Sequence, residues 1–363
     1  ALVRLGQFAQ RRGLERGAAR RIAGAATLEE GLERMSREGS ATRIIALLAA
    51  FLAAFTFSSQ AFAKDALSHF IFVGGSELSE HEATLERSDI AGAQVIYPWR
   101  AREAKEGDYT FEKIERDLSV AERLGKHLFI QVQDRFFLPT ARNLPDYILT
   151  EPAYGGGLVR QSDNPGEGKA KGEGWVAAQW NPAVRARVQA LLTALGERFD
   201  GRVYGINLPE SSIEVATQGR KAPDGFTCDT YVDATLENAA VAKAAFPSSH
   251  VVQYVNFWPC EWNDSEGYMS RTFAWALEKG VGLGGPDIIP YRRGQIKNSY
   301  PFFARYGDKL DLVAMAVQGP TLTYTNPKTG QRFTRAQFED YAVNDLRVDI
   351  IFWSVNSPWI QDR

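Results

Sequence analysis

The sequence contains few of the residues that build metal clusters and disulfide frameworks. Its 363 residues include two Cys, four His and three Met, too few for a multi-disulfide mini-fold or a metal cluster. Basic and acidic residues nearly cancel, at 42 Lys and Arg against 44 Asp and Glu, so the excess of positive charge typical of nucleic-acid binding is missing. Hydrophobic residues at 44% and charged residues at 24% instead indicate an ordinary soluble globular protein.

Residues 35–63 have the layout of a secretory signal peptide. Arg37 and Arg43 flank a short basic region, Ile44–Phe57 is a 14-residue apolar run, and a small-x-small site ends at Ala63. A membrane anchor is disfavoured because a span needs about 20 apolar residues. We therefore expect cleavage after Ala63, no stable membrane anchor afterwards, and a secreted or periplasmic protein.

The predicted export segment divides the chain into three parts. Residues 1–34 carry seven Arg and no Lys, and we expect them to be non-native or disordered upstream sequence. Residues 64–363 then form one domain with 33 basic and 39 acidic residues, a formal net charge of −6. We expect this domain to be a monomer that binds no nucleic acid.

Eight short runs of β-branched and aromatic residues predict parallel strands that are covered on their outer face. They are His69–Gly74, Gln94–Trp99, His127–Gln133, Arg202–Leu208, His250–Asn256, Val281–Gly284, Leu312–Val317 and Val348–Trp353. Eight alternations of strand and helix in about 300 residues predict a single (β/α)₈ TIM barrel, with a short or missing last helix. A doubly wound sheet is the alternative, but Gly74-Gly75 is not followed by the glycine-rich phosphate turn typical of that fold.

Helical patterns lie between these strands. Asn181 followed by Pro182 predicts the N-cap of a long helix, and Thr110 predicts the cap of an earlier one that ends at Gly125. A weaker helix near Glu82–Ile90 is expected after a cap at Ser79. The other predicted helices are Thr230–Phe246, Gly267–Lys279, Ser299–Tyr306 and Thr334–Leu346.

A TIM barrel builds its active site from the loops that follow the carboxyl ends of its strands. Polar and aromatic residues gather at those predicted ends: Trp99, Arg100, Asp134, Asn207, Glu210, Tyr254, Asn256, Trp258, Glu261, Trp262, Asp287, Gln318 and Trp353. Seven of the eight Trp lie at these ends or in their loops, and indole faces with surrounding amides and carboxylates suit a sugar. The alternative is that some of these Trp fill ordinary space between helices. The third loop, 136–179, is expected to be either a wall of the cleft or a solvated insertion.

Several segments resemble the (β/α)₈ glycoside hydrolases, and especially the large retaining group called clan A. The run from Trp99 to Phe111 is similar to the segment that follows the second strand in that group, and Gly205–Glu210 is similar to the fourth-strand segment that carries Asn and an acid/base Glu. Val348–Trp353 looks like the eighth strand, whose Trp floors the sugar subsite. The resemblance implies a TIM-barrel glycosidase without a cofactor.

The sequence departs from clan A at two positions. Two residues separate Asn207 from Glu210, whereas members of the clan place them side by side. The position of the seventh-strand nucleophile holds Gln318, which cannot form a glycosyl ester. The retaining mechanism therefore does not transfer whole.

Hydrolysis of a glycoside normally needs one protonated and one ionised carboxyl group. Glu210 is the first candidate for the acid, and an ion pair with Arg100 or Arg135 is its structural alternative. Asp287 is a candidate base or nucleophile unless it only caps a helix or a turn. Glu261 is the second candidate for that role, or a ligand of a sugar hydroxyl. Asp134 is a weaker candidate, with a predicted place in substrate binding, and its alternative is an ion pair with Arg135. Glu214 either faces the same loop or caps its turn.

Other chemistries find little support in the sequence. His69, His127 and His250 stand at strand beginnings, and no metalloprotease, nucleophile-elbow or P-loop motif occurs, so no metal site is predicted. Cys228 and Cys260 are expected either to form a disulfide or to be two free thiols.

The first functional hypothesis is an exported glycosidase acting on a poly- or oligosaccharide. The alternatives are a catalytically inactive carbohydrate-binding barrel, which Gln318 favours, and another barrel enzyme such as a lyase.

Overall fold

The computed structural model describes residues 67–162, 173–215 and 221–361. The predicted segments 1–34 and 35–63 lie outside the described residues. No helix within the described ranges is both long and apolar enough to cross a membrane.

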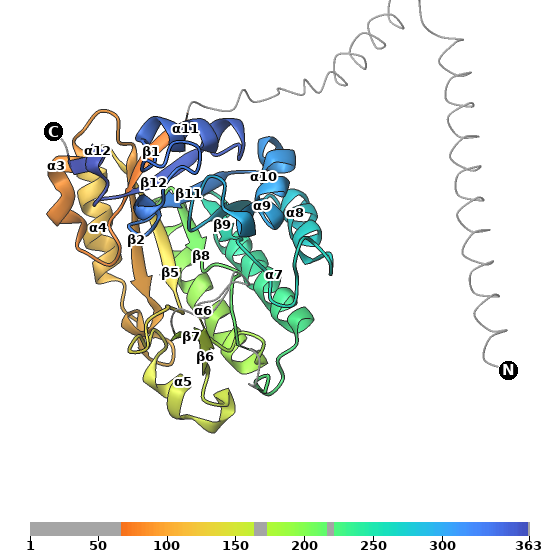
Figure 1. Ribbon diagram of the computed structural model, residues 1–363. Helices are drawn as coiled ribbons and strands as arrows, with labels where there is room; N and C mark the ends of the chain where they lie inside the picture. The colour runs from red at the N-terminus through yellow and green to blue at the C-terminus, as the bar shows by residue number, and fades with distance from the viewer. Residues whose placement is uncertain (1–66, 163–172, 216–220, 362–363) are drawn as a thin grey trace, which may run out of the picture. The chain divides into compact units, whose positions relative to one another are not determined.

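Eight parallel strands close into one barrel, which confirms the predicted (β/α)₈ TIM fold over the doubly wound alternative (Figure 1). The strands are β1 (Ser68–Phe72), β2 (Gly92–Pro98), β5 (His127–Gln133), β8 (Gly205–Leu208), β9 (His250–Tyr254), β10 (Gly282–Gly285), β11 (Val313–Val317) and β12 (Ile350–Ser354). Each overlaps one of the eight predicted runs. Strands that follow one another in this list are hydrogen-bonded neighbours in the barrel. The last strand, β12, pairs with β1, with His69 opposite Ile351, and this pairing closes the barrel.

The barrel interior is filled by alternate residues of each strand. Phe70, Phe129 and Phe352 meet at its centre. The ring of Phe352 packs edge-on against Phe70 and Phe129, with centroids 5.7 and 5.2 Å apart. Gly284 is required at this depth, because a Cβ there would lie 1.8 Å from the Ala314 carbonyl oxygen and 3.1 Å from Cδ1 of Tyr254. Residues that alternate with these point outward against the helices.

The outer layer contains most of the predicted helices. They are α4 (Glu112–Arg123), α6 (Pro182–Phe199), α7 (Cys228–Ala245), α8 (Tyr268–Lys279), α9 (Arg293–Lys297), α10 (Tyr300–Tyr306) and α11 (Arg335–Asn344), with 3₁₀ turns at η4 (Gly307–Lys309) and η5 (Thr321–Thr323). Asn181 caps α6 as predicted, and its side-chain oxygen accepts hydrogen bonds from Ala183 N at 2.8 Å and Val184 N at 3.4 Å. Thr110 does not cap α4. Its peptide N–H donates to the Arg102 carbonyl at 2.8 Å, so it belongs to the preceding hairpin.

The first helix of the barrel is short. The first consists of η1 (Leu78–His81) and α3 (Glu82–Leu85), and its cap is not Ser79. The carboxylate of Asp117 on α4 instead accepts a hydrogen bond from Leu78 N at 2.9 Å. The last described helix is α12 (Pro358–Gln361), and it is four residues long.

The loops at the carboxyl ends of the second and third strands carry their own structure. The second has η2 (Trp99–Ala101) and the hairpin β3 (Glu103–Lys105) and β4 (Asp108–Tyr109). The third has α5 (Asp146–Thr150), η3 (Pro152–Tyr154) and the antiparallel pair β6 (Leu158–Ser162) and β7 (Glu173–Ala177), which lie together at the lower end of the molecule in Figure 1. Residues 155–157 are all glycine because each has a positive φ, between 58° and 84°.

Candidate active site

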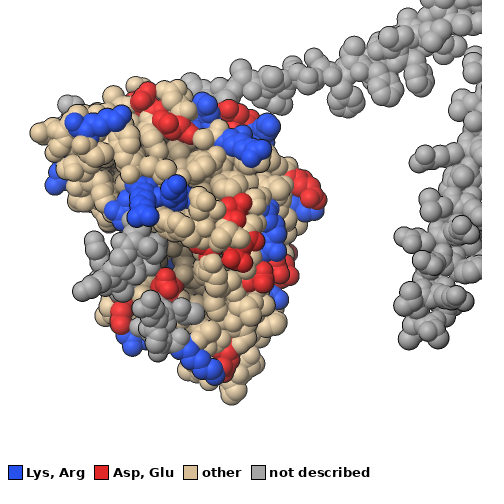
Figure 2. All heavy atoms as spheres, turned by 45° about the vertical axis from the view of Figure 1, so that its right-hand side comes forward, with Lys and Arg blue, Asp and Glu red and all other residues tan. Residues whose placement is uncertain are grey.

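A cleft of about 850 Å³ opens among the loops at the carboxyl ends of the strands. Residues from the first, second, third, fourth, fifth, sixth and seventh strand ends line it. Five of the residues predicted from the sequence are among them: Glu210, Tyr254, Asn256, Asp287 and Gln318. Figure 2 shows acidic and basic side chains interspersed with other residues on the visible described surface of one face.

Asp287 is half-buried in the cleft wall and held by a neighbouring loop. Its Oδ1 accepts a hydrogen bond of 2.5 Å from Oγ1 of Thr321, and its peptide oxygen accepts one of 3.1 Å from the Tyr300 hydroxyl. The negative charge of Asp287 also contributes to the raised pKa of Tyr254, after burial. A hydroxyl donated to the carboxylate favours its ionised form.

Glu210 lines the cleft at the end of the fourth strand. Its peptide oxygen accepts a hydrogen bond of 2.7 Å from Nη1 of Arg135. Arg135 is itself buried and bonded to Asp134 at 2.8 Å and to the Tyr231 hydroxyl at 2.7 Å. Asp134, 2% exposed, therefore forms the expected ion pair with Arg135 and does not line the cleft.

Glu214 also lines the cleft, on the same loop as Glu210, which is the first of the two alternatives that the sequence left open for it. Its neighbours Ile213 and Val215 are buried, and its peptide oxygen accepts a hydrogen bond of 3.0 Å from Ser162 N at the end of β6. Within the described part of the chain its carboxyl group has no hydrogen-bond or ion-pair partner. Burial raises the pKa of Glu214 above its ordinary value.

The bottom of the cleft is built from neutral side chains that point into the barrel. Nε2 of Gln94 donates to Oδ1 of Asn207 at 2.6 Å and to the Tyr254 hydroxyl at 2.9 Å. Gln131 lies beside Asn207 in the register of β5 and β8. Asn207, predicted to bind substrate, is 0% exposed and supports Tyr254 from beneath. Gln131 and Tyr254 are the members of this group that line the cleft.

Three of the predicted Trp are fully buried outside the cleft, which corrects the expected aromatic sugar platform. Trp99 donates from Nε1 to Glu103 at 2.7 Å, and Trp258 packs against Tyr231. Trp353 is 0% exposed, and its ring packs edge-on against Trp359 at 5.2 Å between centroids. The side chain of Trp353 points outward from β12 toward the helices. It therefore cannot form the bottom of the cleft.

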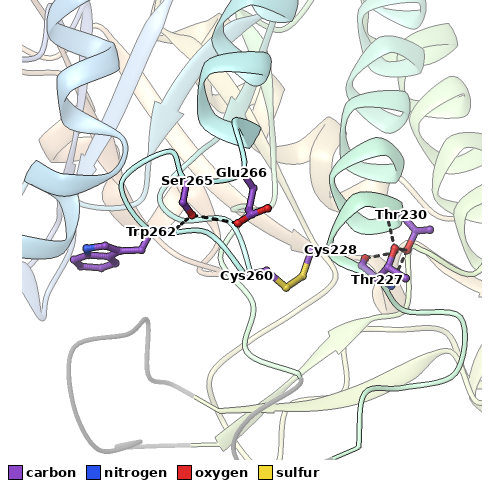
Figure 3. The surroundings of a disulfide bond; sticks show 7 residues. All are labelled: Thr227, Cys228, Thr230, Cys260, Trp262, Ser265 and Glu266. Carbon is purple, nitrogen blue, oxygen red and sulfur yellow. Dashed lines mark hydrogen bonds between the residues drawn. A yellow bond between two sulfur atoms is a disulfide. The ribbon is translucent and has the colours of Figure 1, made fainter.

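Trp262 and Arg100 are exposed but do not line the cleft. Figure 3 shows Trp262 projecting away from the nearby disulfide, and its side chain is 36% exposed. Arg100 makes an ion pair with Asp146 of α5, with Nη2 and Oδ1 2.7 Å apart. The aromatic residues that do line the cleft are Phe and Tyr: Phe72, Phe136, Phe137, Tyr254, Phe257 and Tyr324.

The predicted catalytic role of Glu261 is also corrected, because this residue caps a helix. It is buried beneath the first turn of α8, where its two carboxylate oxygens accept hydrogen bonds from Tyr268 N at 2.6 Å and Met269 N at 3.1 Å. These two N–H groups lack partners inside the helix, and a negative charge there also complements the helix dipole. The residue therefore has a structural role that accounts fully for its position.

Glu261→Ala tests this reassignment. We expect the variant to lose about 1–2 kcal/mol of unfolding free energy, the usual cost of removing a cap, and to keep the catalytic rate within twofold. Urea unfolding followed by fluorescence gives the first quantity, and initial rates on any accepted substrate give the second. Glu266→Ala, at an exposed position of the same loop, is the control. A fall of more than tenfold in kcat with unchanged stability would return Glu261 to the catalytic candidates.

The two cysteines form a disulfide, which resolves the alternatives left by the sequence (Figure 3). Cys228 is the first residue of α7, and Cys260 lies in the loop after β9, three residues beyond the cleft residue Phe257. The bond therefore ties the outer helix layer to a loop at the mouth of the barrel.

Residues that could together hold a metal ion do not occur in the described ranges. No group of three or more His, Cys, Asp and Glu side chains converges there. His69, His127 and His250 stand at the amino ends of β1, β5 and β9, as predicted. The polar side chains that line the cleft carry carboxyl, amide, hydroxyl and guanidinium groups.

No protein-family model matches the sequence, and a comparison with curated proteins finds no match. Solved structures do match the fold. The catalytic domain of β-amylase from Paenibacillus polymyxa superposes with a TM-score of 0.53 at 8% identity, over 80% of this chain and 94% of that one. The fold is one that glycoside hydrolases use. The β-galactosidases from the psychrophilic Marinomonas ef1 and the haloarchaeon Halorubrum lacusprofundi both superpose with a TM-score of 0.50, at 10% and 11% identity.

The two β-galactosidases are much longer proteins. The superposition covers 79% of this chain in both cases, but 54% and 52% of theirs. At such identities the likeness shows the shared barrel alone. The resemblance to (β/α)₈ glycoside hydrolases is thereby confirmed for the fold, and the choice of catalytic residues depends on the geometry of the cleft.

Proposed function

We propose that this protein hydrolyses O-glycosidic bonds of a poly- or oligosaccharide with carboxyl groups of the cleft as acid and base. The observation that carries the proposal is that Glu210, Glu214 and Asp287, from the ends of two strands, line one cleft in different environments. Glycoside hydrolysis needs two carboxyl groups kept in opposite protonation states.

Asp287 is assigned the ionised role. The 2.5 Å hydrogen bond from Thr321 stabilises its carboxylate and orients it. Gln318 lines the same cleft where the resemblance places the nucleophile of clan A. Because an amide cannot form the glycosyl ester, Asp287 takes over as the base that activates water or as the nucleophile itself. The anomeric configuration of the first product, measured by NMR, distinguishes the two.

The proton donor is assigned to the loop after the fourth strand. Glu210 holds the position that the resemblance matches to the acid, whereas Glu214 has the environment that an acid needs. Burial raises the pKa of Glu214, which favours the protonated form that a general acid needs. We therefore assign proton donation to Glu214 and retain Glu210 as the alternative.

Export is part of the same proposal. The layout of residues 35–63 supports a substrate outside the cytoplasm, and a disulfide suits an oxidising compartment.

A glycan-release screen tests the proposed activity. The full chain and its Glu210→Gln variant are incubated with a panel of plant and microbial polysaccharides, and released reducing ends are measured. Release by the wild type supports a hydrolase. Equal release by Glu210→Gln would remove Glu210 from the mechanism. Binding without any release would favour the inactive carbohydrate-binding barrel, for which the Gln at position 318 is the argument.

The pH profile identifies the donor. A general acid with a raised pKa must be protonated, so wild-type kcat/KM should fall as pH rises through the pKa of Glu214. Glu214→Gln should abolish this basic limb and lower the rate by about 10²-fold on substrates with poor leaving groups, while aryl glycosides with acidic phenols react nearly normally. Glu210→Gln is the matched comparison. If that variant loses the limb and Glu214→Gln keeps it, the assignment reverses.

A further inference from the structure

Aromatic residues line the cleft on two opposite sides of the barrel. Phe136 and Phe137 come after β5, and Tyr324 comes after β11. In the closed strand order, β5 and β11 lie four strands apart, which in a barrel of eight strands places them on opposite sides. The cleft therefore extends across the mouth of the barrel, with Phe136 and Phe137 as one wall, the Phe136 wall, and Tyr324 on the other.

The Phe136 wall is rigid and leads out of the cleft. The peptide N–H of Phe136 donates to the Trp175 oxygen at 3.0 Å, and its peptide oxygen accepts from Trp175 N at 2.9 Å. Gly174 packs so closely that a Cβ there would lie 2.0 Å from the Phe136 oxygen. The side chains of Phe136 and Leu138 are nevertheless 41% and 49% exposed. The backbone is thus fixed by β7, while an accessible apolar surface continues from the cleft toward solvent.

The opposite wall, the Tyr324 wall, consists of Tyr324 and Arg292. Both residues are half-buried and line the cleft, and Cζ of Arg292 lies 5.2 Å from the centre of the Tyr324 ring. The peptide N–H of Tyr324 donates to the Thr321 oxygen at 3.2 Å. Thr321 is also the residue whose hydroxyl holds the carboxylate of Asp287. The second wall is therefore connected through η5 to the proposed base or nucleophile.

The candidate catalytic groups lie between the two walls in the strand order. Going round the barrel from β5 to β11, one passes β8, β9 and β10. Glu210 and Glu214 follow β8, and Asp287 follows β10. A glycan chain that contacts both walls therefore passes these carboxyl groups, and a bond cleaved there has sugar units on both of its sides.

The size and chemistry of the cleft suit several sugar units. Its volume of about 850 Å³ lies in the upper part of the range of roughly 300–1,000 Å³ that holds a whole drug-sized ligand. A single sugar ring is smaller than such a ligand, so more than one unit fits. The apolar face of a sugar ring packs on an aromatic side chain whether or not the ring carries a charge. The two walls therefore serve neutral and acidic glycans alike.

We infer that the cleft binds an internal stretch of a glycan chain, with sugar units held by the Phe136 wall on one side of the carboxyl groups and by the Tyr324 wall on the other, and that cleavage falls within the chain. This inference rests on the proposed function, because it takes the ligand of the cleft to be a glycan. It adds the mode of cleavage and the residues that set the cleaved position.

The loss of viscosity tests the mode of cleavage. The full chain is incubated with solutions of xylan, barley β-glucan, galactomannan, amylose and polygalacturonate, and viscosity is followed together with released reducing ends. An accepted polysaccharide should lose most of its viscosity while only a small fraction of its linkages has been cleaved, because each internal cut divides a long chain. Products of many lengths should appear from the start.

Variants of the two walls test the residues. The substrates are hexaoses labelled at the reducing end, from the cellulose, xylan, mannan, amylose and polygalacturonate series. Phe136→Ala and Tyr324→Ala should each lower kcat/KM on an accepted hexaose about fivefold. They should shift the preferred cleavage site in opposite directions, because each variant favours binding that fills the remaining wall. Tyr324→Leu, which keeps apolar volume in the loop, should shift it as Tyr324→Ala does.

The matched control removes an aromatic side chain outside the cleft. Trp262 is 36% exposed and does not line the cleft, so Trp262→Ala should leave both kcat/KM and the preferred cleavage site unchanged. A variant that merely weakened the fold would lower the rate at every bond equally. The direction of the shift therefore separates sugar binding from a structural effect.

The inference is overturned if accepted chains are shortened from one end alone, if the two wall variants shift the cleaved position in the same direction or not at all, or if no glycan is bound or cleaved. Its failure differs from the failure of the proposed function. Shortening from one end would leave the hydrolase in place. Hexaoses whose affinity, measured by calorimetry, falls in both variants but which are never cleaved would refute the hydrolase and support binding on both sides.

Discussion

Asp287→Asn is expected to lower kcat about 10³-fold while oligosaccharide binding changes less than threefold. The substitution keeps the size of the side chain but removes the charge that Thr321 stabilises, so neither water activation nor ester formation can occur at this position. General base or nucleophilic groups contribute roughly 10²–10⁴-fold to such reactions. Stopped assays of reducing-end release, combined with calorimetry of the bound oligosaccharide, separate the two effects.

Two further variants serve as comparisons for Asp287→Asn. Asp233→Asn makes the same substitution on the exposed face of α7 and should leave kcat unchanged. Thr321→Val removes the hydrogen bond to Oδ1 but keeps the carboxylate, and should reduce kcat about tenfold. An Asp287→Asn variant that retained more than a tenth of the wild-type kcat would exclude this residue, and the acid/base pair would then have to be sought between Glu210 and Glu214.

Removing the disulfide is expected to cost about 3–4 kcal/mol of unfolding free energy. Cys228 and Cys260 are separated by 32 residues, and closing a loop of that length restricts the unfolded chain by about this amount. For a domain of about 300 residues the loss corresponds to a Tm roughly 5 °C lower. The double variant Cys228→Ser/Cys260→Ser can be compared with the wild type by calorimetry.

A reductant provides the control for the disulfide prediction. Treating the wild type with a phosphine should lower its Tm by the same amount, whereas the double variant should no longer respond. If the double variant melts within 1 °C of the wild type, the bond contributes no net stability.

The barrel could be predicted from the sequence because its signals are local. Each strand is a short apolar run between helix caps and glycines, so the spacing of runs such as His127–Gln133 determines the topology without knowledge of distant contacts. The helix caps were predicted less reliably than the strands. Thr110 has the side chain of a cap, but a hydrogen bond to Arg102 places it in a hairpin instead.

The candidate site was less predictable because finding the end of a strand does not by itself show which of its residues point into the barrel. Trp353 and Phe352 are adjacent, yet Phe352 points into the barrel and Trp353 points out. The two-residue period of the strand would have revealed this, since Ile350 and Phe352 share the inner face. The hydrogen bond between Thr321 and Asp287 joins residues 34 positions apart, and no sequence pattern indicates it.

The bond between the Ser162 amide and the Glu214 carbonyl has a consequence for protein engineering. The β6–β7 hairpin is an obvious segment to exchange when a new substrate range is wanted, because Ser162 and Phe136, which pairs with β7, both line the cleft. Such a graft would also remove a support of Glu214. A chimera with a foreign hairpin would therefore lose turnover together with its old specificity, unless the new segment supplies an N–H at the same place.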